Sequence, residues 1–171
     1  MRWTEGHIHL AMRRIMKSCG WTLIAGEFPG GSDHELYPLN VVDPAVARDA
    51  SPDPRRHSLG ELIPDLVALK GRQLTIFEAK VLYSEPDRLK LEDLLSARRD
   101  DLWAALNKFA HERNFPELLP VEGLQLLPVL AFRAGVPAPP PVHKFSYLRV
   151  ADLTSGYFEG RLNVGSSSVG S

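Results

Sequence analysis

Cysteine is nearly absent from this sequence, and long apolar runs are missing altogether. The single cysteine, Cys19, excludes an intrachain disulfide framework and a cysteine-rich zinc site. No apolar stretch is long enough to cross a bilayer, and the N-terminal residues lack the apolar segment of a signal peptide. We therefore expect a cytoplasmic protein without a membrane partner.

An excess of positive charge is also missing. The 20 Lys and Arg residues are balanced by 21 Asp and Glu, so the formal net charge is −1 and the chain as a whole does not attract nucleic acid. A local basic patch or a partner subunit could still supply a positive field. The candidate patches are Arg13-Arg14, Arg55-Arg56-His57 and Arg98-Arg99. A solvated surface pair is the simpler interpretation of each patch.

The composition that is present is typical of an ordinary globular protein, with 44% hydrophobic and 24% charged residues. A length of 171 residues suits one domain, which we expect at residues 1–164, followed by a flexible Gly/Ser tail at 165–171. Pro, Gly and Asp are concentrated between residues 26 and 60. A loop of that length in a compact domain is functional, mobile or contains short strands.

Hydrophobic periodicity predicts the order of the secondary-structure elements. The expected helices span residues 4–20 and 84–109, and the expected strands span residues 21–25, 62–69, 73–82, 124–132 and 145–150. Thr4 and Ser84 are suitable N-caps, and Lys70-Gly71-Arg72 joins two of the strands as a hairpin. This order predicts an α/β fold with helices on both faces of a mixed sheet.

Charged side chains interrupt this apolar hairpin. By the two-residue period of a strand, Glu78 and Lys80 point to the same face. Pairing of the two strands brings Asp65 to a rung near Glu78, so the two carboxylates can converge. Carboxylates in a partly buried site repel each other unless a cation lies between them, which favours a hard divalent ion such as Mg²⁺. Lys80 could then orient or help deprotonate an attacking water, or offset charge on a phosphorane.

Glu5 is a further candidate, because it lies three residues before Ile8 on the core-facing stripe of the first helix. It could reach the same cation, although the helix dipole alone also favours an acidic residue there. For the motif as a whole, the alternative is a structural ion pair between Glu78 and Lys80, with Asp65 at the end of a turn. His7 and His9 do not face each other on a helix, so we expect no histidine metal site there.

Pro64-Asp65, followed thirteen positions after the aspartate by Glu78-Ala79-Lys80, resembles the signature of the PD-(D/E)xK nuclease superfamily. The resemblance covers roughly residues 4–132. It implies a restriction-endonuclease-like core of helix, three strands, helix and strand, which is the order predicted above. The implied site residues are Asp65, Glu78, Lys80 and Glu5 as catalytic residues, Asp65, Glu78 and the Ala79 carbonyl as metal ligands, and Lys90 as an auxiliary residue. Arg98 and Arg99 are candidates for substrate binding.

The resemblance implies a metal-dependent endonuclease that uses Mg²⁺, with Mn²⁺ as a substitute, to hydrolyse phosphodiester bonds in DNA. Cleavage of RNA by the same chemistry is equally compatible with these residues. No target-recognition segment is evident beyond the core, so we expect a homodimer or a subunit of a restriction, defence or repair assembly. The alternative is a catalytically silent scaffold with the nuclease fold. The presence of Asp65, Glu78 and Lys80 together argues against this alternative.

Overall fold

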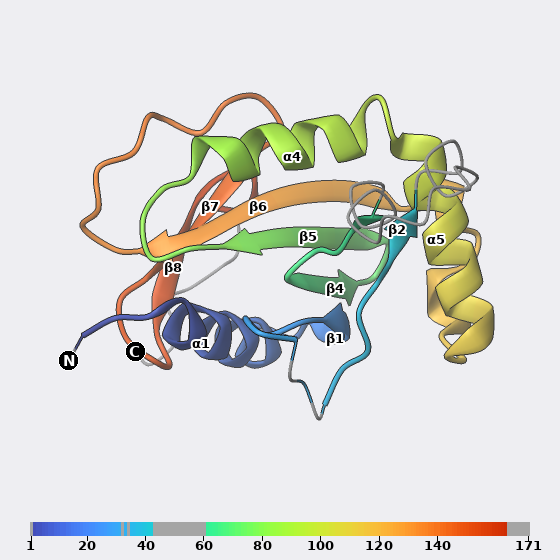
Figure 1. Cartoon of the computed structure of the whole chain (residues 1–171), viewed down its shortest axis with the longest axis horizontal. Coiled ribbons are helices and arrows are strands. Elements are labelled where there is room, and N and C mark those ends of the chain that lie inside the picture. Colours follow the sequence, from blue (N-terminus) through green and yellow to red (C-terminus); the bar gives the residue numbers. More distant parts are fainter. Residues whose placement is uncertain (1, 32, 34, 43–60, 164–171) are drawn as a thin grey trace, which may run out of the picture.

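A mixed sheet of six strands, in the order β1-β4-β5-β6-β7-β8, forms the centre of the fold (Figure 1). The computed structural model describes residues 2–31, 33, 35–42 and 61–163. The strands of this sheet are β1 (Thr22–Gly26), β4 (Leu66–Lys70), β5 (Gln73–Ala79), β6 (Gln125–Arg133), β7 (Ser146–Val150) and β8 (Gly156–Gly160). The three strands β5, β6 and β7 run parallel, and the other neighbours pair antiparallel. The predicted α/β class with a mixed sheet is confirmed.

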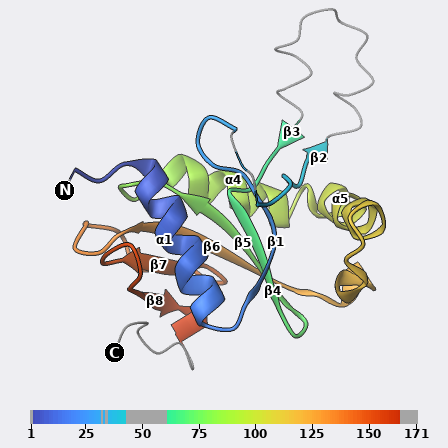
Figure 2. The ribbon, with the colours of Figure 1, turned by 90° about the horizontal axis from the view of Figure 1, so that it is seen from below.

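Helices cover both faces of the sheet. Helix α1 (Glu5–Ser18) lies across one face and α4 (Glu85–Leu95) across the other, while α5 (Arg99–Glu112) packs against α4 and β2 at one end of the sheet (Figures 1 and 2). Alternate residues of β5 show this division. Leu74 and Ile76 pack in the cluster that contains the apolar residues of α4 and α5, whereas Phe77 and Ala79 pack in the cluster with α1. A strand with two apolar faces is thereby buried on both sides.

The two predicted N-caps are confirmed. The Thr4 hydroxyl accepts a hydrogen bond from the His7 N–H at 3.3 Å, and the Thr4 N–H donates to His7 Nδ1 at 2.9 Å. Ser84 accepts in the same way from the Asp87 N–H at 3.3 Å. Both helices that border the candidate site therefore have fixed N-termini, because these bonds satisfy backbone donors that a helix leaves free.

The single helix expected over residues 84–109 is wrong, because the chain forms α4 and α5 with a break between them. The Ser96 hydroxyl donates to the Glu92 carbonyl at 2.6 Å, a local bond that competes with helix continuation. The chain then turns at Arg98, the N-cap residue of α5. This break lets Leu102 and Leu106 enter the same core as the apolar face of α4.

The strand expected at residues 62–69 is also divided. Its first residues belong to a separate two-stranded sheet, in which β3 (Glu61–Leu62) pairs with β2 (Val41–Val42). Pro64 explains the division, because proline cannot donate a ladder hydrogen bond. Between these two short strands, residues 43–60, which include the Arg55-Arg56-His57 patch, lie outside the described residues, as does the predicted tail.

Short elements complete the fold. The described part of the chain has three 3₁₀ turns, at Pro116–Leu118, Val121–Gly123 and Arg161–Asn163. Strand β8 was not predicted, because glycines at both of its ends indicate turns. Among the described residues, no helix combines the length and apolar character that crossing a membrane requires.

Candidate functional site

The topology brings the predicted acidic residues to one edge of the sheet. In the β4–β5 hairpin, Leu66 pairs with Phe77, so the preceding Asp65 lies level with Glu78. A hydrogen bond of 3.0 Å from the Asp65 N–H to the Phe77 carbonyl extends this pairing beyond β4. The expected placement of Asp65 and Glu78 on nearby rungs is confirmed. The N-terminal ends of α1 and α4 lie at the same edge (Figure 1).

Asp65 is held at the centre of this edge. Its Oδ2 atom accepts a hydrogen bond of 2.8 Å from the N–H of Ala79, the last residue of β5. The same oxygen lies 3.8 Å from His9 Nε2 on α1. Glu5, His9 and Asp65 each offer one ligand atom, and all three atoms lie within 4.8 Å of one another. Asp65 therefore faces two potential metal ligands, Glu5 and His9, that both come from α1.

Glu78 points to the other side, toward α4. Its side chain is 4% exposed, and its Oε1 atom lies 2.7 Å from Lys90 Nζ. Burial raises the pKa of Glu78 from 4.5 to about 9; the Asp65 carboxylate adds to this effect and Lys90 opposes it. Lys90, the candidate auxiliary residue, is thus brought into direct contact with Glu78. A buried carboxyl group beside a second carboxylate is more easily ionised when further positive charge is close by.

Lys80 contacts α1 rather than Glu78. Its N–H donates to the Ala131 carbonyl at 3.0 Å, but strand β5 already ends at Ala79. Its ammonium group lies 2.9 Å from Glu5 Oε1 and is half exposed. The hydrogen bond to Glu5 raises the pKa of Lys80 above its usual value.

The expected common orientation of Glu78 and Lys80 is therefore wrong, because Glu78 pairs with Lys90 of α4 and Lys80 pairs with Glu5 of α1. Strand β5 ends at Ala79, so the alternation of a strand does not extend to Lys80. The alternative interpretation, a structural Glu78–Lys80 ion pair, is not the arrangement found: Glu78 pairs with Lys90, and Lys80 pairs with Glu5. The long lysine side chain makes this possible, since it follows the last strand residue and can reach past the sheet edge.

His9 is the site residue that sequence reasoning missed. Its side chain is 1% exposed, and neither ring nitrogen has a hydrogen-bond partner among the described residues. Burial lowers the pKa of His9 from its usual value, against the opposing effect of the Asp65 and Glu5 carboxylates. Comparing His9 with His7 was misleading. The informative spacing is four residues, which places Glu5 and His9 on one helix face.

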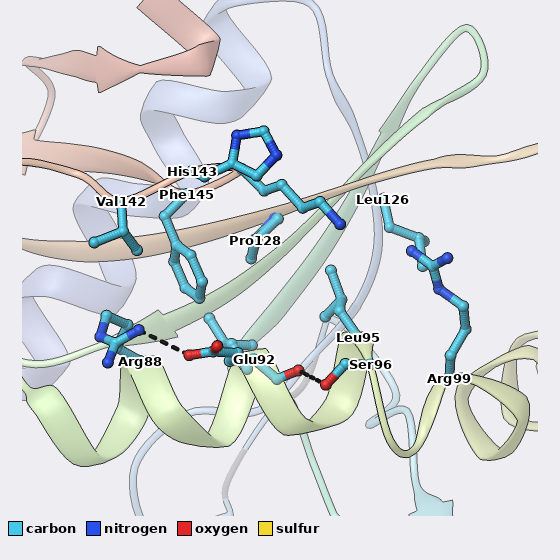
Figure 3. A pocket seen from close by; sticks show the side chains of 12 residues that line it. Arg88, Glu92, Leu95, Ser96, Arg99, Leu126, Pro128, Val142, His143 and Phe145 are labelled. Atoms are coloured by element: carbon cyan, nitrogen blue, oxygen red, sulfur yellow. Dashed lines mark hydrogen bonds and ion pairs between the residues drawn. The ribbon is translucent and has the colours of Figure 1, made fainter.

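The two arginines expected to bind substrate are not part of this cluster. Arg98 caps α5, where its Nε atom lies 3.3 Å from Asp101 Oδ2. Arg99 lines a cavity of about 370 Å³ between α4 and the start of β6 (Figure 3). Leu126 in this cavity and Ala131 beside the acidic edge are five residues apart on β6, roughly 17 Å along the strand.

Comparisons of the chain with protein-family models, with curated proteins and with solved structures gave no match.

Proposed function

We propose that this chain is a metal-dependent nuclease of the PD-(D/E)xK type that hydrolyses phosphodiester bonds in DNA. The observation that carries the proposal is the strand pairing that sets Asp65 level with Glu78, where the Asp65 carboxylate acts on the buried Glu78 carboxyl group, with Lys80 directly after the strand. The order α1, β1, β4, β5, α4, β6 also agrees with a restriction-endonuclease-like core, which we include in the proposal.

The donor set at this edge fits a divalent cation. Asp65, Glu78 and Glu5 supply carboxylate oxygens, and buried His9 nitrogens have no hydrogen-bond partner among the described residues. Positive charge here would offset the repulsion that raises the pKa of Glu78. Asp65, Glu78 and the Ala79 carbonyl are the ligands that the resemblance implies for Mg²⁺. Such an ion, when bound, supplies Lewis-acid stabilisation of phosphoryl charge and a more acidic water.

The protein's own groups have separate roles in this proposal. The Ala79 N–H fixes the orientation of the Asp65 carboxylate. Lys90 holds Glu78 and limits its pKa. Lys80 is half exposed, so its ammonium group can approach a phosphate and offset charge that develops on the phosphoryl oxygens. Each of these contacts positions a group before the substrate arrives.

The net charge of −1 bears on how nucleic acid is held. An isolated chain with this charge binds DNA weakly, and its binding falls with salt where phosphate contacts dominate. A second copy of the chain, or a partner subunit of a restriction, defence or repair assembly, would supply the remaining contacts. We include such an assembly in the proposal.

The direct test is incubation with single-stranded, duplex and branched DNA, and with RNA, each in Mg²⁺, Mn²⁺ or EDTA. We expect cleavage of a DNA substrate with either metal and none in EDTA. Lys80→Ala should slow cleavage by at least about 100-fold while Mn²⁺ still binds. The control is Lys108→Ala, which removes an exposed lysine of α5 and should retain the wild-type rate.

Failure to cleave any of the four substrates with either metal would contradict the proposal and favour the silent scaffold. Cleavage of RNA alone would retain the chemistry but change the substrate. A Lys80→Ala variant that cleaves at the wild-type rate would remove Lys80 from the mechanism.

A further inference from the structure

A buried histidine lies between two carboxylates on the α1 side of Asp65. His9 is 1% exposed, and neither of its ring nitrogens finds a hydrogen-bond partner among the described residues. A buried polar group without a hydrogen bond is unfavourable, so its position needs an explanation. The ring nitrogen Nε2 lies 3.8 Å from Asp65 Oδ2, too far for a hydrogen bond.

The same separation suits two ligands of one metal ion. Ions bound at about 2.0–2.2 Å hold their ligand atoms roughly 3–4.4 Å apart, depending on the angle. The 3.8 Å between His9 and Asp65 is within this range. The ligand atom of Glu5 lies within 4.8 Å of both, so at most a small side-chain adjustment brings it to the same ion. Three protein ligands, two of them charged, would then meet one cation.

The surroundings fix this geometry. Glu5 and His9 are four residues apart on α1, whose N-terminus is capped by Thr4, so their side chains share one face of a rigid element. Asp65 is oriented independently by the Ala79 N–H at 2.8 Å. The ring of Phe28 lies 5.8 Å from the imidazole and restricts the space around it. Ligands held in advance on two packed elements are those that a metal site requires.

From this geometry we infer that Glu5, His9 and Asp65 form a cation site that takes a divalent first-row transition-metal ion in preference to Mg²⁺. Imidazole nitrogen suits transition ions, whereas Mg²⁺ is bound through oxygen and retains several waters. For its place in a reaction the inference rests on the proposed nuclease function, in which Asp65 is shared between this site and Glu78. Metal binding itself requires no nucleic acid.

Lys80 gives the site a second property. Its ammonium group already lies 2.9 Å from Glu5 Oε1, so Lys80 and the ion compete for one carboxylate. Binding of the ion should therefore weaken the contact between Lys80 and Glu5, and a loaded site should leave Lys80 freer to meet a phosphate. Lys80→Ala should accordingly bind Mn²⁺ at least as tightly as the wild type.

Mn²⁺ is the probe for the test, used with the metal-free full chain. Pulsed electron paramagnetic resonance should detect coupling of bound Mn²⁺ to a ¹⁴N nucleus, and calorimetry should give an affinity at least about tenfold above that for Mg²⁺. His9→Gln should lose the nitrogen coupling and at least about tenfold in Mn²⁺ affinity. The matched control is His111→Gln, an exposed histidine of α5, which should retain both.

Several results would overturn the inference. They are Mn²⁺ bound without nitrogen coupling, no Mn²⁺ binding, or a folded His9→Gln that keeps the wild-type affinity. If His9→Gln does not fold, the coupling in the wild type and the affinity of Glu5→Gln, which should fall, still decide the question. If Mn²⁺ shows nitrogen coupling but no nucleic acid is cleaved, the metal site stands and the nuclease function is wrong. If nucleic acid is cleaved with Mg²⁺ but Mn²⁺ shows no nitrogen coupling, the nuclease function stands and the metal site is wrong.

Discussion

Two ionic clusters meet on α1, and they differ in how completely their charges are matched. In the first, Arg13 pairs with Asp33, and both side chains are nearly buried. Asp33 also accepts hydrogen bonds from the N–H groups of Glu35 and Leu36, at 2.9 and 3.0 Å. In the second, Asp65 lies beside buried Glu78 and buried His9, whose ring nitrogens have no hydrogen-bond partner in the described part of the chain.

The pKa values of the two clusters move in opposite directions. Burial raises the pKa of Asp33, but hydrogen bonds from Arg13 and from two backbone N–H groups outweigh it, and the net shift is downward. Burial and the Asp65 carboxylate raise the pKa of Glu78, despite the contact with Lys90. The first cluster pairs its buried charges within the protein and holds the segment after β1 on α1. The second would be stabilised by further positive charge.

The largest expected effect comes from breaking the pair of Arg13 and Asp33. Asp33→Ala leaves the buried Arg13 guanidinium with Glu35, 3.8 Å away, in place of its close partner, and we expect the free energy of unfolding to fall by about 3–5 kcal/mol. Chemical denaturation measures this change. The control is Lys17→Ala, which removes an exposed pair with Glu35 and should change stability by less than about 1 kcal/mol. Equal losses in the two variants would contradict the distinction.

The second effect separates activity from stability. Asp65→Asn keeps an oxygen that can accept the Ala79 N–H but removes the charge beside Glu78. We expect cleavage to fall by at least about 100-fold, while the metal-free protein remains as stable as the wild type or becomes more stable. Cleavage assays and thermal melting in EDTA test the two parts. A strongly destabilised Asp65→Asn protein would show that Asp65 is structural.

The third effect is a pH dependence of opposite sign in the two clusters, measured without divalent ions. Folding lowers the pKa of Asp33 below its ordinary value of 3.8. Asp33 therefore stabilises the fold at pH values above 3.8, and this contribution is lost as the pH falls through the pKa of Asp33 in the folded protein. Folding raises the pKa of Glu78 from 4.5 to about 9. The stabilisation linked to Glu78 is therefore fully present at pH values below 4.5 and is lost as the pH rises toward about 9.

Urea denaturation across this pH range should separate the two contributions. The plot of the free energy of unfolding against pH should lose slope in each variant. Asp33→Asn should lose it on the acid side, and Glu78→Gln should lose it between pH 4.5 and about 9. If the free energy of unfolding of Glu78→Gln kept the wild-type dependence on pH between 4.5 and about 9, the opposite signs proposed for the two clusters would be contradicted.

The smallest effect concerns Lys80. Its pair with Glu5 is half exposed, so Lys80→Ala should lower the free energy of unfolding by less than about 1 kcal/mol. Thermal melting at low and high salt checks this value, and the difference from wild type should shrink as salt rises. A loss as large as that of Asp33→Ala would mean that the Lys80–Glu5 pair supports the fold.

The short-range part of this site could be predicted from the sequence. The register of one hairpin places Asp65 beside Glu78, and that register follows from the turn and the apolar pattern. The contact of Lys80 with Glu5 joins residues 75 positions apart, and it depends on where β5 ends and how α1 crosses the sheet. Hydrophobic periodicity predicts neither the last residue of β5 nor the path of α1 across the sheet.

Other differences have local causes. The break between α4 and α5 is accompanied by the Ser96 hydroxyl bond to the Glu92 carbonyl, a contact that a helical pattern does not reveal. Strand β8 begins at Gly156, where a Cβ atom would lie 2.5 Å from the Arg149 carbonyl oxygen. The glycine that permits this close pairing is the same residue that indicates a turn in the sequence.

The tip of the β4–β5 hairpin offers a practical handle. Gly71 has a φ of +61°, and a Cβ added there would have no neighbour within 4 Å among the described residues. The flanking side chains are anchored, since Lys70 donates to the Cys19 carbonyl at 2.9 Å and Arg72 to the Glu117 carbonyl at 2.9 Å. Asp65 and Glu78 lie at the far end of the same two strands, six and seven residues from Gly71 and therefore roughly 20 Å away. A fluorophore or affinity tag attached beside Gly71 would therefore leave the acidic edge intact.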